Sequence, residues 1–97
     1  MNDTAREALV SAALRGTKQV YGIYSDFQGG LCAMGVLIEA AGANMEECCR
    51  SPIKLMRVWN LYDLAMLEVE KIQRMNDEGK DFLTIARKIG NPEETNG

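Results

Sequence analysis

The sequence predicts a mostly α-helical (α+β) fold, a single compact domain of four to five helices with a short β element near residues 18–30. Three observations lead to this fold class. Apolar residues recur at three- and four-residue steps along much of the chain, as in amphipathic helices. The stretch from Gly29 to Gly42 carries almost no charge, which predicts a central buried helix. Finally, 97 residues, 46% of them hydrophobic, are enough for one core but not for two.

The first predicted helix covers residues 4–15. Alanines and leucines repeat there at helical spacing, and Gly16 is a natural end because glycine adopts the left-handed conformation without steric cost. Residues 18–24 are rich in strand formers around Gly22. We expect a short strand there, paired in a hairpin with residues 27–31 and lying against helices, since two strands alone are marginally stable.

The central helix is predicted at residues 31–41. Glu39 is its only charge, so nearly the whole circumference should be buried. Gly35 lies inside this helix and costs about 1 kcal/mol relative to alanine. That cost predicts a packing reason for the glycine, such as a close helix crossing.

After the central helix we expect a short polar connection over residues 43–50. Ser51 and Pro52 then predict a new helix, because serine is a good cap and proline suits the first helical position. The apolar stripe that follows is continuous over residues 53–76, which can be read as one helix or as two.

A break near residues 58–60 is the interpretation that we favour for this long stripe. Asn60 can cap a second helix, with Asp63 completing a pattern like a capping box. A turn is expected over residues 76–80. Asp81 should cap a last helix at 82–89. Together the elements make one domain, 1–97, in which 90–97 is predicted to be a flexible tail.

Two blocks of the sequence resemble a family of small, mostly uncharacterised proteins of bacteriophages and their bacterial hosts. The first block is Lys18-Gln19-x-x-Gly22, Asp26 and Gly30-Leu31-Cys32-Ala33-Met34-Gly35-Val36-Leu37, closing with Gly42; the second is Met75-Asn76-Asp77-Glu78-Gly79 followed by Phe82, Ile85 and Ala86. Together they cover about half of the chain. The family has no agreed activity, so the resemblance implies an origin and an architecture rather than a mechanism.

Charge and composition argue against several classes of partner. The net charge is −3 and the isoelectric point is about 4.9, so nucleic-acid binding is not expected. The longest apolar run, residues 31–38, is far shorter than the roughly 20 residues that cross a bilayer. The polar start of the chain shows no secretory signal, and three cysteines do not form an even disulfide framework. We therefore expect a soluble, cytoplasmic protein.

Cys32 is the sharpest candidate for chemistry. It is predicted in the first turn of a helix, where the helix dipole lowers a thiol pKa. The chain contains no histidine, however, and a cysteine nucleophile needs a base to activate it. Free cysteine is also among the most buried residue types. We therefore favour a packed core thiol over a nucleophile.

The other two cysteines, Cys48 and Cys49, are adjacent. Paired cysteines in structural zinc sites are typically separated by two to four residues, and such sites have four ligands. We therefore expect exposed loop thiols, no metal site and no cofactor.

Asn76 and Asp77 open an oxygen-rich turn. A calcium loop of the EF-hand type is excluded, because Phe82 falls where that loop needs glycine. A capped turn between two helices explains Gly79 and Asp81 but needs neither of the first two residues. A hydrogen-bond network that joins this turn to the Cys32 helix would account for them.

Three other features are weaker candidates for binding. Gly29 and Gly30 precede a helix, as in anion sites, but without the rest of a phosphate-binding motif they indicate a turn. Trp59 and Tyr62 beside the apolar run 61–67 fit either a dimer face or, as we favour, the core. Residues 81–90 resemble the first half of a helix-turn-helix, but the residues after them do not predict a recognition helix.

From these patterns we expect a small non-catalytic accessory or interaction protein of phage or mobile-element origin, which binds a host or phage protein or itself as a homodimer. Two alternatives stay open. One is a nucleic-acid-associated regulator with a degenerate helix-turn-helix at its C-terminus. The other is a small-molecule binder with a pocket between the Cys32 helix and the turn at residues 76–81.

Overall fold

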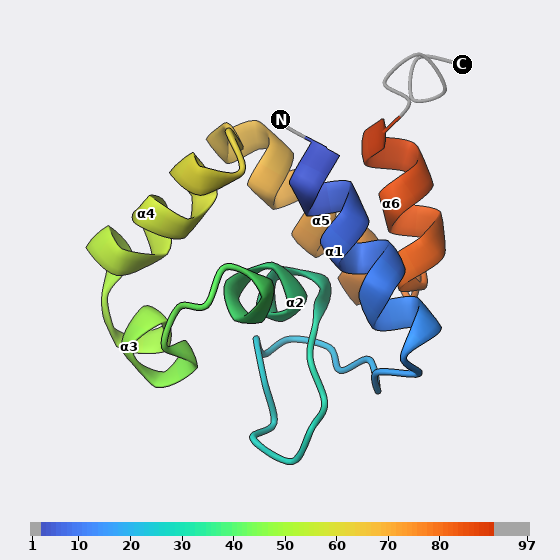
Figure 1. The fold of residues 1–97 in the computed structure, drawn as a ribbon, viewed down its shortest axis with the longest axis horizontal. Coiled ribbons are helices and arrows are strands. Elements are labelled where there is room, and N and C mark those ends of the chain that lie inside the picture. The colour runs from blue at the N-terminus through green and yellow to red at the C-terminus, as the bar shows by residue number, and fades with distance from the viewer. Residues whose placement is uncertain (1–2, 91–97) are drawn as a thin grey trace.

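Six α-helices form within residues 3–90, the part of the chain that the computed structural model describes (Figure 1). In chain order they are α1 (Asp3–Leu14), α2 (Ala33–Ala40), α3 (Met45–Arg50), α4 (Pro52–Leu61), α5 (Met66–Asp77) and α6 (Phe82–Gly90). The mostly α fold class is confirmed. The prediction of four to five helices was one too low, because α3 forms where a polar connection was expected. Asn44 caps α3 by accepting from the Glu47 amide at 2.9 Å.

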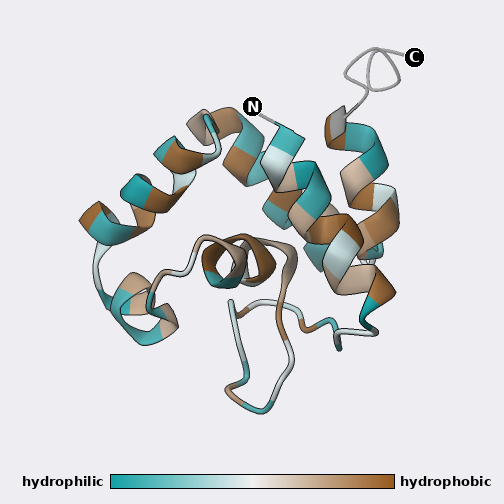
Figure 2. Ribbon diagram, viewed as in Figure 1, coloured by the Kyte–Doolittle hydropathy of each residue, from teal (hydrophilic) through white to brown (hydrophobic). Residues whose placement is uncertain are grey.

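Helix α2 occupies the centre of the molecule and is almost entirely apolar (Figure 2). Six of its eight residues are buried, because α1, α5, α3 and α4 all pack against it. Helices α1 and α6 lie side by side and run in opposite directions, so α1 begins and α6 ends at the same end of the body (Figure 1). The first and last described helices therefore pack against each other, and α1 also packs against the central α2.

The predicted strand at residues 18–24 does not form. The described residues contain only two isolated bridges, and both involve Leu31, which pairs in parallel with Gln19 and antiparallel with Ser25. Leu31 donates to the Lys18 carbonyl at 2.9 Å and accepts from Val20 at 3.1 Å. The predicted hairpin is also wrong, because the backbone between residues 18 and 31 is a wide loop whose polar groups are satisfied by side chains as well as by backbone.

Packing requires glycine at position 35, as predicted, but the close contact is with the loop before α2 and not with another helix. A Cβ atom at this position would lie 1.9 Å from the Tyr24 carbonyl oxygen. The same carbonyl accepts from the Cys32 amide at 3.1 Å. Gly35 therefore lets the loop backbone lie directly on the first turn of α2.

The long stripe over residues 53–76 forms two helices, with the break several residues later than predicted. Helix α4 continues to Leu61, and Asp63 adopts a positive φ of 55°. Asn60 does not cap α5, which begins after Ala65, whose amide donates to the Glu68 carboxylate at 3.0 Å. The break between the two helices lies later than predicted because the chain turns at Asp63, which has a left-handed φ, and not at a capping side chain of Asn60.

The core interpretation of Trp59 and Tyr62 is confirmed. Both side chains are buried, and the Tyr62 hydroxyl donates to the Leu37 carbonyl in α2 at 2.5 Å. Leu61 and Leu67 of the same apolar run are 64% and 80% exposed. The run is therefore divided between core and surface.

The turn between α5 and α6 follows the prediction. Gly79 has a φ of 91°, and Asp81 caps α6 by accepting from the Thr84 amide at 2.8 Å. Gly90, predicted as the start of the tail, is the last residue of α6. The rest of the predicted tail, and any recognition helix after α6, lie outside the described residues.

Candidate functional site

A pocket of about 470 Å³ lies between the loop that precedes α2 and the last turns of α5. On one side it is lined by loop residues 22–25 and Phe27, and on the other by Gln73, Asn76 and Asp77. Cys32 and Cys49 complete the lining. Its volume lies within the range of ordinary ligand sites. Residues far apart in the sequence therefore meet in one concave site.

Asn76 joins the two sides of this pocket. Its side chain is 1% exposed, and its Oδ1 accepts from the Ala33 amide at 2.9 Å and from Gln19 Nε2 at 2.9 Å. Its Nδ2 donates to the Val20 carbonyl at 3.0 Å. The predicted hydrogen-bond network between this turn and the Cys32 helix is confirmed, and it also holds the loop.

Asp77, one residue later, contacts the loop from the solvent side. Its Oδ1 accepts from the Gly22 amide at 3.2 Å, in an exposed position. Gln19 contributes a second link by donating to the Lys80 carbonyl at 2.7 Å. Three side chains thus hold the loop on the C-terminal end of α5.

Cys32 is the N-cap of α2, and its Sγ accepts from the Gly35 amide at 3.4 Å. The thiol is buried. Desolvation raises its pKa, although amide hydrogen bonds from Gly35 and Met34 act in the opposite direction. The lowering influence expected at the start of the helix is therefore present in these amide hydrogen bonds, but burial has the larger effect and the pKa is raised. The packed-thiol interpretation of Cys32 is supported.

The adjacent cysteines have different environments. Both lie on α3 rather than in a loop, and only Cys49 is exposed. Cys48 is 3% exposed, so the expectation of two exposed thiols was wrong for this residue. Successive positions of an α-helix point about 100° apart, so Cys48 can point into the core while Cys49 points to solvent. Within residues 3–90, no group of three or more cysteine or acidic side chains is arranged to hold a metal ion.

We predict that only one of the three thiols reacts quickly in the folded protein. Burial raises the pKa of both Cys32 and Cys48, and only the thiolate is nucleophilic. Iodoacetamide at neutral pH, followed by peptide mass spectrometry, should label Cys49 first, whereas protein unfolded in urea should be labelled at all three positions. Rapid labelling of Cys32 in the native protein would contradict this environment.

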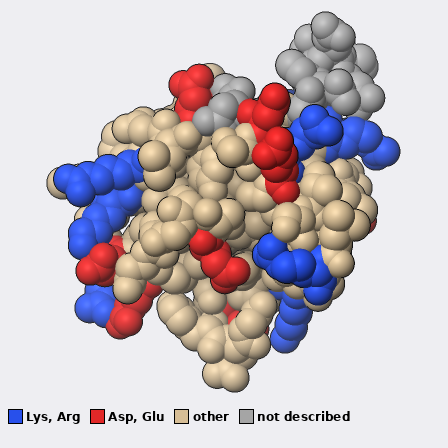
Figure 3. Space-filling view, in the orientation of Figure 1, with Lys and Arg blue, Asp and Glu red and all other residues tan. Residues whose placement is uncertain are grey.

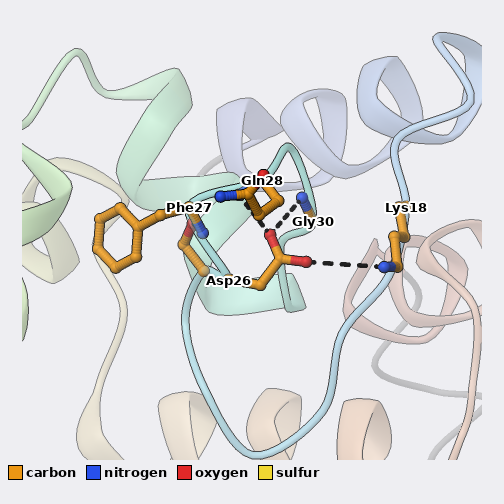
Figure 4. Close-up of polar contacts among 6 residues, drawn as sticks. Lys18, Asp26, Phe27, Gln28 and Gly30 are labelled. Carbon is orange, nitrogen blue, oxygen red and sulfur yellow. Dashed lines mark hydrogen bonds and ion pairs between the residues drawn. The ribbon is translucent and has the colours of Figure 1, made fainter.

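The Gly29-Gly30 pair forms the turn that was expected, together with Asp26 (Figure 4). The Oδ1 atom of Asp26 accepts from the Gln28 and Gly30 amides, both at 2.8 Å, and Lys18 Nζ lies 3.7 Å from Oδ2. A Cβ on Gly30 would lie 2.6 Å from Asp26 Oδ2. The amides that would hold an external anion therefore bind a carboxylate of the chain itself.

The two amide hydrogen bonds, with help from Lys18, lower the pKa of Asp26 below its ordinary value. A carboxyl whose pKa is lower in the folded state stabilises the protein above the unfolded pKa, near 3.9. That contribution is lost as the pH falls through the lower, folded value. We predict that Asp26→Asn reduces stability at neutral pH and flattens its dependence on pH below about 4, measured by urea unfolding across that range. An unchanged pH profile would contradict this role.

Phe27 stands out in this loop. Its φ is 57°, in the left-handed region that a bulky residue rarely adopts, and its side chain is 61% exposed. In Figure 4 its ring points away from the Asp26 carboxylate. Tyr21 and Ile23 are also more than half exposed. The projection that the loop makes at the bottom of Figure 3 is almost free of charged side chains.

The structure brings together three of the residues singled out from the sequence, Cys32, Asn76 and Asp77. Gly29 and Gly30 belong to the turn that supports the pocket, and Trp59 and Tyr62 lie apart from it in the core. Sequence reasoning missed Gln19, Tyr24, Phe27 and Gln73. The signal present in the sequence was the close spacing of three aromatic residues, Tyr21, Tyr24 and Phe27.

Comparisons with protein-family models, with curated proteins and with solved structures found no match for this chain. The resemblance to small phage and bacterial proteins therefore stays a prediction. Among residues 3–90, none of the helices has the length and apolar character needed to cross a membrane.

Proposed function

We propose that this chain is a non-catalytic interaction protein and that it binds its partner through one surface, the loop face. The loop face consists of the exposed side chains of Tyr21, Ile23 and Phe27 and the pocket beside them. The observation that carries the proposal is that Phe27 is held exposed at a positive φ. Strained backbone of this kind persists only where the surroundings impose it, and it is concentrated at functional sites.

The rigidity of the loop supports this proposal. Side chains from α5 hold the loop at Gln19, Val20 and Gly22, and the Asp26 turn fixes the residues beside Phe27. A binding surface that is fixed before association loses less conformational entropy when the partner arrives. Aromatic residues are also enriched in protein interfaces.

The buried, protonated state of Cys32 supports a function without covalent catalysis, since a thiol with a raised pKa is a poor nucleophile at neutral pH. The proposal includes three expectations from the sequence: an origin in a phage or mobile element, a cytoplasmic location, and a host or phage protein as the partner. A second copy of the chain is the other partner considered.

We predict that Phe27→Gly abolishes partner binding while leaving stability almost unchanged. The side chain is mostly exposed, and the strain relieved at positive φ, about 1–2 kcal/mol, offsets the entropy that glycine adds to the unfolded chain. The measurement is affinity capture from a lysate of the cells that encode the chain, at moderate salt, with urea unfolding in parallel.

Ile53→Ser is the matched control, because Ile53 is 67% exposed on α4, away from the pocket. It should leave capture unchanged. Loss of the captured protein in Ile53→Ser but not in Phe27→Gly would place the binding surface on α4 and overturn the proposal. Size-exclusion chromatography of the two variants tests the homodimer in the same way.

The pocket itself favours a small-molecule binder as a second candidate function. Its size suits a small ligand, and any ligand that binds only the folded state raises the melting temperature. A thermal-shift screen of metabolites against wild type and Asp77→Asn tests this candidate. A stabilising compound that still acts on Phe27→Gly would favour it over the loop face.

A further inference from the structure

We propose that the pocket of the loop face accepts an arginine side chain of the partner protein, with its guanidinium group paired to the Asp77 carboxylate. This inference rests on the proposed function and names the chemistry that the partner presents. It follows from the charge, the hydrogen bonding and the aromatic content of the pocket.

Asp77 gives the pocket its charge. It is the only carboxylate among the lining residues, and no lysine or arginine of residues 3–90 lines the pocket. Its Oδ1 accepts from the Gly22 amide, whereas no hydrogen bond from the described residues reaches Oδ2. Asp77 is also the last residue of α5, where the helix dipole is negative and favours a cation. The charge complement of this site is a positive group.

An anionic group has no comparable place in the pocket. The first amides of α2, which would attract an anion, already have acceptors within the chain. The Cys32 amide donates to Tyr24, the Ala33 amide to Asn76 and the Gly35 amide to Cys32 Sγ. The positive end of α2 is therefore satisfied by the protein itself.

The lining favours arginine over lysine. The residues that line the pocket include two aromatic residues, Tyr24 and Phe27, and the apolar Ile23. A guanidinium group stacks on aromatic rings and pairs with a carboxylate through two parallel hydrogen bonds, whereas an ammonium is a compact, strongly hydrated charge. The apolar stem of arginine suits the loop side of the pocket.

The test uses NMR amide shifts of the full chain during titration with acetyl-Gly-Arg-Gly-amide. We expect shifts at Gly22, Ile23 and Asp77, with half-saturation in the millimolar range for so small a probe. The same peptide with citrulline, which has the shape of arginine without its charge, should bind about tenfold more weakly. Asp77→Asn, which keeps an acceptor for the Gly22 amide, should weaken arginine binding by a similar factor.

Glu78→Gln is the matched control, because it removes a neighbouring carboxylate that does not line the pocket. The inference is overturned if the citrulline peptide binds equally well, if no shift occurs up to about 50 mM peptide, or if Glu78→Gln weakens binding as much as Asp77→Asn. A lysine peptide that binds as tightly as the arginine peptide contradicts the choice of arginine.

The proposed binding surface and the proposed arginine ligand can be rejected independently of each other. If Phe27→Gly abolishes capture of the partner but the arginine peptide does not bind, the loop face is retained and arginine is rejected. If the arginine peptide binds through Asp77 while Phe27→Gly still captures the partner, the pocket has its ligand and Phe27 is rejected as the contact that carries partner binding.

Discussion

Replacing Asn76 with leucine is expected to destabilise the protein by about 3–5 kcal/mol, because several buried polar groups lose their partners at once. The Ala33 amide and the Val20 carbonyl would each lose the hydrogen bond that Asn76 provides, and Gln19 would lose its contact with Oδ1. Leucine has a similar volume but neither donor nor acceptor. Every buried side-chain nitrogen or oxygen of residues 3–90 has a partner, so this change introduces a defect that the described fold does not contain.

Urea unfolding of Asn76→Leu against wild type measures this loss. Asn60→Leu is the control, because Asn60 is an exposed asparagine on α4, and substitutions at such positions usually change stability by less than about 0.5 kcal/mol. Asn76→Asp provides a second comparison, since aspartate keeps the acceptor but cannot donate to Val20. If Asn76→Leu were no more destabilising than Asn60→Leu, the network would not hold the loop.

Gly35→Ala is expected to destabilise the protein by about 3 kcal/mol or more, as severe overpacking does. The direction of this stability change is informative. Alanine is the better helix former by about 1 kcal/mol, so helix propensity alone would make the variant more stable. The new Cβ would lie 1.9 Å from the Tyr24 carbonyl oxygen, and both atoms are attached to backbone. The loop therefore has to leave α2, and the hydrogen bond from the Cys32 amide to Tyr24 is lost with it.

Ala40→Gly is the matched control for Gly35→Ala, since it makes the opposite change at an exposed position of the same helix. It should cost no more than about 1 kcal/mol. Amide shifts in Gly35→Ala should change throughout loop residues 18–31, which separates release of the loop from general unfolding. A Gly35→Ala protein as stable as wild type would show that the loop does not rest on α2.

The helices could be predicted from the sequence wherever an apolar stripe was long enough to show its period. Helices α1 and α6 were placed within one residue at each end, because caps and glycines mark their limits. Helix α3 was missed because six residues complete fewer than two turns, which is too short for periodicity. Asn44 before it and the acidic pair Glu46-Glu47 in its first turn were the local signals of a helix start.

The candidate site was predicted in part, and the difference has a physical reason. Asn76 and Asp77 attracted attention because a turn between helices needs fewer polar groups than the sequence supplies. The loop was mistaken for a strand because Val20, Ile23 and Tyr24 are strand formers. Side chains from residues more than 50 positions away satisfy part of its backbone, and propensity does not report such distant partners.

The antiparallel pairing of α1 and α6 has a geometric consequence. The first residue of α1 and the last residue of α6 lie at one end of the body, and the loop between α1 and α2 reaches to the opposite end (Figure 1). A segment joined before α1 or after α6 therefore leaves from the end remote from the pocket. A fusion partner joined directly to the start of α1 or to the end of α6 should therefore leave the loop face open to solution, and a circular permutant that links these two helix ends directly should keep that face intact.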